Sequence, residues 1–303
     1  MDVIPVLRGK RILLGVGGSI AAYKAADLAS RLTQAGARVD AILTAAASRF
    51  VTPLTFQSLT GRPAPADLWS EGAHVLHVGL ADGADLLLVA PATADLLAKL
   101  AHGLADDLLT VTALAARCPL LIAPAMDAGM FEHPAVQANL AALLARGATA
   151  IGPAEGRMAS GLTGRGRMLE PDEILGHVRR AAGRKGPLAR RHVVVTAGGT
   201  EEPVDPVRIL SNRSSGKQGF ALAQAALDRG ADVTLVAAPC SLPTPVGASR
   251  VDVSTAQEMA HAVLEACANA DALVMAAAVA DFRPARPADH KLKKDAGLPA
   301  LEL

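Results

Sequence analysis

Three turns in the N-terminal half of the chain have residue types suited to holding a nucleotide-like cofactor. Ala90-Pro91-Ala92 and Ala123-Pro124-Ala125 each end an aliphatic run, and small side chains let a flat ring approach the backbone while proline fixes the turn. Gly17-Gly18-Ser19 lies between an aliphatic run and an amphipathic stretch, where N–H groups and a helix dipole suit a phosphate. The spacing is not that of a dinucleotide fingerprint, so an ordinary strand-to-helix turn is the alternative. The residues that we expect around the ligand are Gly17, Gly18, Ser19, Thr44, Pro91, Thr93, Ala125 and Met126.

Two further features near these turns suggest catalysis. His77 lies just before the apolar run that ends at Ala90, and an imidazole can act as acid or base near neutral pH, although a purely structural histidine is the alternative. Residues 156–171 (GRMASGLTGRGRMLEP) are rich in glycine and are predicted to form a long loop. A long loop inside a compact domain usually serves as a lid.

The C-terminal half contains comparable turns. Ala197-Gly198-Gly199-Thr200 follows an aliphatic run, and Ser214-Ser215-Gly216-Lys217 opens an amphipathic stretch with hydroxyls, amides and an ammonium group that suit an anion. The second motif lacks the spacing of a Walker A loop. Lys291, Lys293 and Lys294 form a basic segment that is explained equally well as a solvated loop.

The elements that position these turns occur in two successive copies. Strand, glycine turn, helix, glycine and strand follow one another over residues 11–43 and again over 192–236, and GADLLLVAPATAD (83–95) is echoed by NADALVMAAAVAD (269–281). Alternating strands and helices at this spacing predict βαβ units with parallel sheets. We therefore predict an α/β fold, a flavodoxin-like or Rossmann-like parallel-sheet domain followed by a partial second Rossmann-like domain.

The domain boundary is predicted in the basic segment GRKGPLARR, which glycine and proline interrupt. The predicted organisation is a first domain over 1–182, a linker over 183–190 and a second domain over 191–303. In the first domain we expect strands near 11–16, 38–43, 85–90, 119–123 and 148–151. The second domain shows only three strands, and its tail HKLKKDAGLPALEL looks like a loop entering a strand with nothing to pair against, so a C-terminal truncation is expected.

Composition narrows the classes of partner and location. The chain has 303 residues, 51% of them hydrophobic but only 2% aromatic, which suits two cores built on aliphatic parallel strands. A net charge of +1 favours neither nucleic acid nor a membrane surface, and the apolar runs are too short to span a bilayer. The N-terminus does not resemble a signal peptide, and three scattered cysteines suggest neither a disulfide framework nor a metal site. We expect a cytoplasmic protein.

Four motifs of the first domain together resemble a known family. GGSIAAYK, APATADLLAKLAHGLADDLL, APAMD and the segments GRMASG and GRGRM look like the homo-oligomeric flavin-containing cysteine decarboxylases, over residues 8–182. Within that family the chain resembles the phosphopantothenoylcysteine decarboxylases. The resemblance implies FMN with its phosphate near Ser19 and its ring against the two Ala-Pro-Ala turns, at a subunit interface of a trimer or dodecamer.

The resemblance also implies a reaction and a role for three residues. FMN oxidises the substrate thiol to a thioaldehyde, CO₂ is lost, and the resulting enethiol is reduced, with His77 as the acid or base. Asp127 stands where the family usually has Asn. An ionised Asp127 would repel the substrate carboxylate and favour its loss, and a protonated one could donate a hydrogen bond. Ser160 stands where the family usually has the cysteine that donates a proton in the reduction, and a hydroxyl is a poorer acid than a thiol.

Three alternatives to the full reaction are considered, of which the first follows from the departure at Ser160. The enzyme could stop at the enethiol, or the chain could be a non-catalytic flavin-binding regulatory subunit, although His77 argues against the latter. An NAD-dependent oxidoreductase is disfavoured by the absence of the dinucleotide fingerprint.

The second domain resembles the phosphopantothenate–cysteine ligases through TAGGTEEPVDPVR, SNRSSGKQG, AAAVADF and KLKK. Together the two halves resemble the bifunctional coenzyme A biosynthesis proteins. The resemblance implies CTP, Mg²⁺, an acyl-cytidylate intermediate and dimer contacts, although no cluster of residues demands a metal. Because members of that family continue beyond this point, ligase activity is not expected from this chain alone. The ligase-site residues implied are Gly199, Arg208, Asn212, Ser215, Lys217, Ala277, Asp281 and Lys291.

Overall fold

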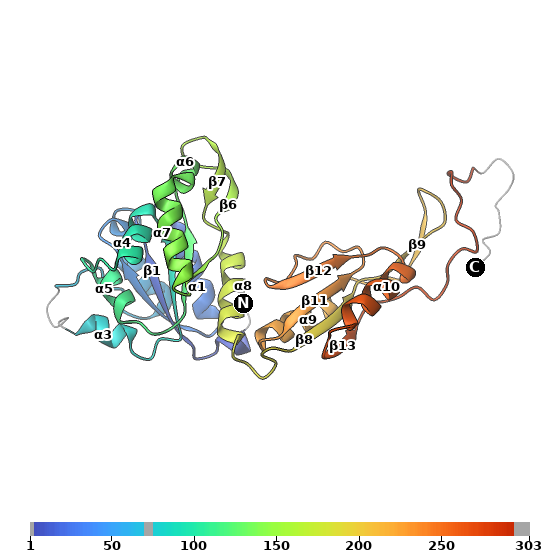
Figure 1. The fold of residues 1–303 in the computed structure, drawn as a ribbon, viewed down its shortest axis with the longest axis horizontal. Coiled ribbons are helices and arrows are strands. Elements are labelled where there is room, and N and C mark those ends of the chain that lie inside the picture. The colour runs from blue at the N-terminus through green and yellow to red at the C-terminus, as the bar shows by residue number, and fades with distance from the viewer. Residues whose placement is uncertain (1–2, 70–74, 294–303) are drawn as a thin grey trace. The chain divides into compact units, whose positions relative to one another are not determined.

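The computed structural model describes residues 3–69 and 75–293. The chain divides into two compact units, residues 1–182 and 183–303, and each unit is built around its own parallel sheet (Figure 1).

The first unit contains a five-stranded parallel sheet. Its order is β2-β1-β3-β4-β5, which is the flavodoxin-like order, with a switch point between β1 and β3. The predicted α/β parallel-sheet fold is therefore confirmed. The strands are β1 (Arg11–Val16), β2 (Arg38–Leu43), β3 (Leu86–Ala92), β4 (Leu120–Pro124) and β5 (Thr149–Ala150).

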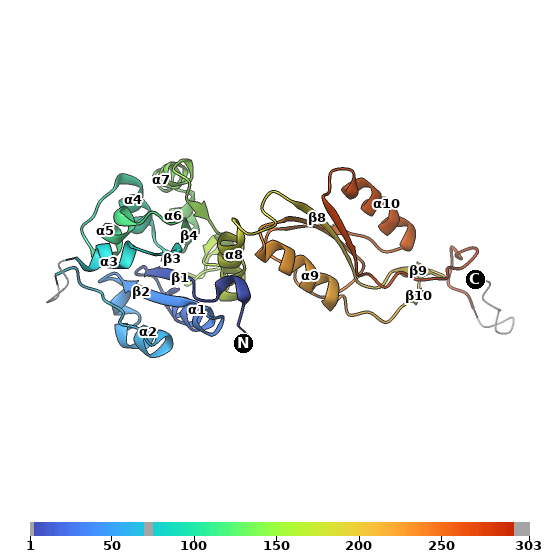
Figure 2. The same ribbon diagram turned by 90° about the horizontal axis from the view of Figure 1, so that it is seen from below.

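Helices cover both faces of this sheet, as Figure 2 shows. The aliphatic side chains of the strands are almost fully buried between them, as expected for parallel strands covered on both sides. One face packs against α1 (Ala22–Gln34), α2 (Pro53–Thr60) and α8 (Pro171–Gly183). The other face packs against α3 (Leu76–Ala81), α4 (Ala94–His102), α5 (Leu108–Ala115), α6 (Ala128–Glu132) and α7 (Pro134–Ala145).

The glycine-rich segment predicted as a long loop is instead mostly a β-hairpin. β6 (Ala154–Arg157) and β7 (Thr163–Arg167) pair in antiparallel fashion, and α8 begins at Pro171. The prediction was wrong because glycines 164 and 166 leave one face of β7 without side chains, which hides the two-residue period of a strand. That bare face lies close to the turn after β4, where a Cβ at Gly166 would overlap the carbonyl oxygen of Met126.

The second unit contains a four-stranded parallel sheet, in the order β12-β11-β8-β13. The expectation of only three strands was wrong, because β12 (Ala-Ser-Arg-Val-Asp) is an edge strand without an aliphatic run. A two-stranded hairpin, β9–β10, was also missed. The elements are β8 (His192–Ala197), β9 (Glu201–Pro203), β10 (Ile209–Ser211), α9 (Lys217–Asp228), β11 (Asp232–Ala237), β12 (Ala248–Asp252), α10 (Ala256–Cys267) and β13 (Ala272–Met275).

Helices α9 and α10 pack against opposite faces of this second sheet (Figure 2). The strand expected within the C-terminal tail falls on residues 294–303, which lie outside the described residues. None of the helices in the described residues combines the length and apolar character that crossing a bilayer requires.

The same aspartate contact fastens both sheets, and it explains the repeat noticed in the sequence. Asp85, just before β3, accepts hydrogen bonds from the backbone N–H of Arg11 and from Lys10 Nζ, both at 2.8 Å. Asp271, just before β13, accepts the N–H of His192 at 2.8 Å and Arg191 Nη1 at 2.7 Å. Burial tends to raise the pKa of Asp85, but the bonds from Lys10 and Arg11 lower it overall. The bond from His192, with Arg191, lowers the pKa of Asp271.

Candidate functional site

A cavity of about 740 Å³ opens where the carboxyl ends of the strands in the first sheet meet. This is the edge at which doubly wound sheets bind ligands. Six of the eight residues predicted to hold the cofactor line this cavity: Gly18, Ser19, Thr44, Thr93, Ala125 and Met126.

The first glycine turn has no space for side chains. A Cβ at Gly18 would overlap that of Ala46, and one at Gly17 would overlap the carbonyl oxygen of Pro91. The Gly17 N–H donates to that oxygen at 3.1 Å, which corrects the expectation that it is free for a phosphate. The hydrogen bond between Gly17 and Pro91 thus joins two turns beside the cavity. Glycine is required at position 17 because the backbone of Pro91 approaches it too closely for a side chain.

Two threonine hydroxyls hold the neighbouring turns. Thr44 Oγ1 accepts the N–H of Ala47 at 3.1 Å, and Thr93 Oγ1 accepts the N–H of Leu96 at 3.3 Å as the N-cap of α4. A hydroxyl that accepts such a bond still has its own hydrogen to donate. Both side chains therefore face the cavity in fixed positions and can donate to a ligand.

Lys99, which was not among the predicted site residues, also lines this cavity. Its Nζ lies 3.0 Å from Asp106, 3.6 Å from Asp95 and 3.8 Å from Asp107. Burial by itself would lower the pKa of the Lys99 ammonium group, but the hydrogen bond with Asp106 and the three negative charges raise it overall. Lys99 therefore stays charged and offsets the carboxylates around the cavity.

A second cavity of about 470 Å³ adjoins the first and shares Ser19, Ala125 and Met126 with it. Asp127 and Ser160 line this second cavity. Ser160 Oγ, in the turn of the β6–β7 hairpin, donates to Asp127 Oδ2 at 2.6 Å. Asp127 Oδ1 accepts the N–H of Gly129 at 3.2 Å and thereby caps α6. The two positions that depart from the family pattern are therefore hydrogen-bonded to each other.

Lys24 is a second residue of the site that was not predicted from the sequence. It is almost fully buried on α1 and lines the second cavity. Its Nζ donates to Glu170 Oε1 at 2.7 Å and to the carbonyl oxygen of Met168 at 3.2 Å. A lysine on the buried face of an amphipathic helix is unusual, because burying an ammonium group requires partners. A lysine at an apolar position of the helical pattern is the sequence signal that could have identified Lys24.

His77 lies on α3 and is absent from the lining of both cavities. Its ring is half-buried, and Nδ1 is buried without a hydrogen-bond partner among the described residues. The structure therefore brings Asp127 and Ser160 together with the cofactor-site residues of the same chain, but not His77.

In the second unit, four of the predicted residues, Gly199, Asn212, Ala277 and Asp281, gather at the carboxyl ends of β8 and β13, the switch point of that sheet. Residues 276–281, which include Ala277 and Asp281, form a loop that neighbouring side chains hold through its backbone. Thr196 Oγ1 accepts the N–H groups of residues 276 and 277 at 3.0 and 3.1 Å. Asn212 Nδ2 donates to the carbonyl oxygen of Val279 at 2.8 Å, and Gly199 forms a bridge with residue 278.

The segment around Lys291 is held by an ion pair. The buried Asp205 accepts Leu292 N–H at 3.1 Å, and Arg208, which pairs with Asp205, donates to the carbonyl oxygen of Leu292 at 3.2 Å. Burial tends to raise the pKa of Asp205, but the backbone N–H bonds and Arg208 lower it overall. Ser215 and Lys217 lie at the start of α9, and a Cβ at Gly216 between them would lie 3.5 Å from the backbone nitrogen of Gly198 in the turn after β8. Among the described residues no group of three or more His, Cys, Asp or Glu side chains is placed to hold a metal ion.

Two family models cover the chain. A model described as flavoprotein matches residues 6–183, and one described as the DNA/pantothenate metabolism flavoprotein C-terminal domain matches residues 188–303. The coenzyme A biosynthesis bifunctional protein CoaBC of Mycobacterium tuberculosis is 51% identical over 300 residues, which is 97% of this chain and 72% of that protein. The chain belongs to the family of coenzyme A biosynthesis bifunctional proteins. The Vibrio vulnificus member of this family is 49% identical over 95% of this chain and 72% of its own length.

Solved structures resemble the first unit of this family member. A PPC decarboxylase mutant complexed with pantothenoylaminoethenethiol has a TM-score of 0.52 and 37% sequence identity, over 57% of this chain and 97% of that one. A protein described as FMN binding has a TM-score of 0.51 and 36% identity, over 57% of this chain and 96% of that one.

Proposed function

We propose that residues 1–182 form an FMN-dependent decarboxylase that converts 4'-phosphopantothenoylcysteine to 4'-phosphopantetheine in coenzyme A biosynthesis. The observation that carries the proposal is the pair of adjoining cavities, one lined by the glycine turn, Thr93 and Ala125 and the other by Asp127 and Ser160. A cofactor and a substrate can occupy such cavities in contact with each other. The similarity to a PPC decarboxylase, at 37% identity, supports the same assignment.

The residues of the first cavity fit FMN. Gly18 and Ser19 would hold the phosphate, the Thr44 and Thr93 hydroxyls would donate to polar atoms, and small residues would allow the ring to lie against the turn at Ala125. The close approach of Gly18 to Ala46 shows that this wall is built without side-chain bulk. When bound, FMN supplies a two-electron acceptor for the substrate's cysteine thiol and returns the electrons after CO₂ has left.

The protein's own residues would orient the substrate and move protons. We assign His77 the role of acid or base. Asp127 would face the substrate carboxylate, which favours carboxylate loss if both groups are charged. Ser160 would donate a proton in the final reduction, for which its hydrogen bond to Asp127 must open.

The position of His77 supports an oligomer. Because His77 lines neither cavity of its own chain, we propose that a neighbouring copy supplies it, in a homotrimer or a dodecamer of such trimers. The exposed hydrophobic side chains Val75 and Val78 flank His77 on α3, and an exposed apolar patch of this kind is suited to burial against another subunit.

For the second unit we propose a phosphopantothenate–cysteine ligase domain, with residues 183–190 as the linker. Gly199, Asn212, Ser215, Lys217, Ala277, Asp281, Arg208 and Lys291 would bind CTP with Mg²⁺, and dimer contacts would form through this domain. The gathering of the loop 276–281, Asn212 and Gly199 at the sheet's switch point supports a nucleotide site. We place the protein in the cytoplasm, whose reducing conditions suit the free thiols Cys118, Cys240 and Cys267.

His77→Asn tests the decarboxylase assignment. We expect the variant to remain yellow with bound FMN but to release CO₂ about 10²- to 10⁴-fold more slowly, because an acid or base group is lost while the cofactor cavity is untouched. His261→Asn, which alters an exposed histidine of α10, should leave both properties unchanged. Purified wild-type protein that retains no flavin would contradict the proposal.

Mixed oligomers test whether His77 acts in a neighbouring copy. His77→Asn and Asp127→Ala should each be inactive alone, and unfolding them together and refolding them as a mixture should restore part of the activity. In a mixed oligomer some sites combine an intact His77 from one chain with an intact Asp127 from another. A mixture as inactive as its components, with exchange of subunits verified by mass spectrometry, would show that His77 acts within its own chain.

A further inference from the structure

Helix α3, which carries His77, packs on the hydrophobic core of the first unit through Leu76 and Leu80. It has only six residues, Leu76–Ala81, and a helix of this length is not stable by itself. Leu80 is its single buried residue, whereas Val75 and Val78 are more than half exposed. The two leucines anchor α3 on the core, and polar contacts to its C-terminal end add a second constraint on its position.

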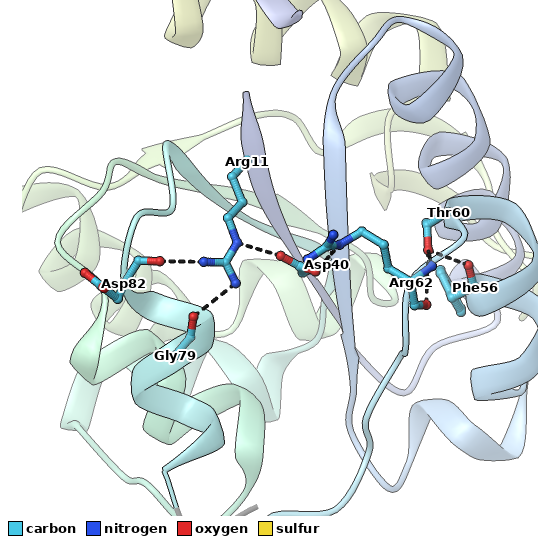
Figure 3. Close-up of polar contacts among 7 residues, drawn as sticks. All are labelled: Arg11, Asp40, Phe56, Thr60, Arg62, Gly79 and Asp82. Atoms are coloured by element: carbon cyan, nitrogen blue, oxygen red, sulfur yellow. Dashed lines mark hydrogen bonds and ion pairs between the residues drawn. The ribbon is translucent and has the colours of Figure 1, made fainter. Parts of the chain in front are cut away.

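The C-terminal end of α3 is held by one guanidinium group, that of Arg11 at the start of β1 (Figure 3). Arg11 Nη2 donates to the carbonyl oxygen of Gly79 at 3.0 Å, and Nη1 donates to that of Asp82 at 2.5 Å. These carbonyl groups lie at the end of the helix, where hydrogen-bond partners are missing and a positive charge is favourable.

Asp40 of β2 fixes the orientation of this guanidinium group. Its carboxylate is almost fully buried and accepts Arg11 Nε at 2.7 Å. Its other oxygen accepts Arg62 Nε at 2.5 Å, from just after α2. Because Nε of Arg11 is bound to Asp40, the two remaining nitrogens of the planar group face α3, as Figure 3 shows.

We propose that Arg11, oriented by Asp40, is a positioning residue for His77. It binds the carbonyl groups two and five residues beyond His77 and thereby sets where the imidazole meets the substrate. The inference rests on the proposed function, in which His77 is the acid or base. A lysine replaces Arg11 only in part, because one ammonium group does not reach a carboxylate and two carbonyl oxygens in a fixed plane.

Arg62 provides a matched control within the same cluster. It bonds to the same carboxylate as Arg11, but its bonds shown in Figure 3 tie it to Asp40 and to Thr60, whose hydroxyl accepts the Arg62 N–H at 3.2 Å. Arg62→Met therefore removes one arginine from Asp40 without removing a contact to α3.

The experiment compares Arg11→Met, Arg11→Lys, Asp40→Asn and Arg62→Met in the full-length, FMN-loaded protein. For Arg11→Met we expect kcat for CO₂ release to fall roughly tenfold to a hundredfold, as small misplacements of catalytic groups do, with KM and flavin content unchanged. Amide hydrogen exchange in residues 75–84 should accelerate. Arg11→Lys and Asp40→Asn should show the same changes to a smaller degree, and Arg62→Met should show neither.

Two results would overturn the proposal. One is unchanged exchange in residues 75–84 when Arg11 or Asp40 is altered, and the other is faster exchange with undiminished kcat. If Arg11→Met does not fold, Arg11→Lys and Asp40→Asn decide by the same criteria. Full activity of His77→Asn would instead remove the proposed role of His77, whereas the exchange data would still show whether Arg11 holds α3.

Discussion

The hydrogen bond between Ser160 and Asp127 determines how the proposed reaction can finish. A serine hydroxyl is a weak acid compared with a thiol, and here its proton is directed at the Asp127 carboxylate at 2.6 Å. Protonating the substrate from Ser160 therefore requires that hydrogen bond to break. The hydrogen bond holds the turn of the hairpin beside the cavity. Asp127 thereby competes with the substrate for the proton of the Ser160 hydroxyl.

We predict that Ser160 is needed for the reductive step and not for loss of CO₂. Ser160→Ala should release CO₂ at the wild-type rate but accumulate the enethiol, whereas wild type and Ser160→Cys should form phosphopantetheine. The products differ by two hydrogens and are separated by mass spectrometry after incubation with phosphopantothenoylcysteine. An identical product from wild type and Ser160→Ala would assign the proton to another group.

Site residues whose hydrogen-bond partners are close in the chain were easier to predict from the sequence than those whose partners are distant in the chain. Thr44 and Thr93 each bond to an N–H three residues later, so their place at a turn follows from the local pattern. Lys24 reaches Glu170 on a different element, and no local pattern indicates that pairing. Gly17 was placed at the correct turn, but its N–H partner is Pro91, on the neighbouring strand β3.

At the scale of elements, the contact of Asp85 fastens the chain segment before β3 to the start of β1. Its pKa is lowered in the folded protein because Lys10 and the Arg11 N–H outweigh the effect of burial. A depressed pKa means that the carboxylate stabilises the fold above the unfolded-state pKa of about 3.9, and that this contribution is lost as the pH falls through the folded-state pKa.

We therefore predict that Asp85→Asn lowers the melting temperature of the first unit at pH 7 and has less effect near pH 3. The Asp85 side chain is 38% exposed, so solvent screening limits the loss to about 1 kcal/mol or less. This corresponds to roughly 2–4 °C for a domain of this size. Lys10→Met, which leaves the backbone bond in place, should have a smaller effect. A difference from wild type that stays constant between pH 7 and pH 3 would contradict the explanation.

Strands were predicted correctly where a continuous aliphatic run indicates that both faces of the strand are buried. They were missed where the side chains of the strand are small or polar. The aliphatic strands β1, β3 and β8 follow directly from their sequences because both faces of each are covered. β7 was missed because glycine occupies the face that meets Met126. β12 was missed because an edge strand buries little, and only pairing with β11 defines it.

At the scale of the whole molecule, the two units have separate hydrophobic cores. The clusters that flank the first sheet and those that flank the second share no residue. The sequence predicted this division because the βαβ pattern starts again after a basic, glycine-containing segment. The number of strands in the second sheet could not be counted reliably from aliphatic runs alone.

Separate cores predict separate responses to ligands. Calorimetry of the full chain should resolve two unfolding transitions, because each core unfolds cooperatively. A saturating excess of FMN, at about 100 times its Kd, should stabilise only one transition, by about 2.7 kcal/mol. CTP with Mg²⁺ should act only on the other transition if the second unit binds it. A single transition that shifts equally with either ligand would contradict independent units.

The Arg11–Asp40 pair also bears on how such an enzyme can change during evolution. The ligand cavities lie at the carboxyl edge of the sheet, whereas Arg11 begins β1 at the amino edge. Under the role proposed for Arg11, substitutions around it alter turnover without altering which ligands bind. Catalytic rate and ligand recognition are then two heritable traits encoded by different residues at opposite edges of one sheet. Selection can change one trait without changing the other.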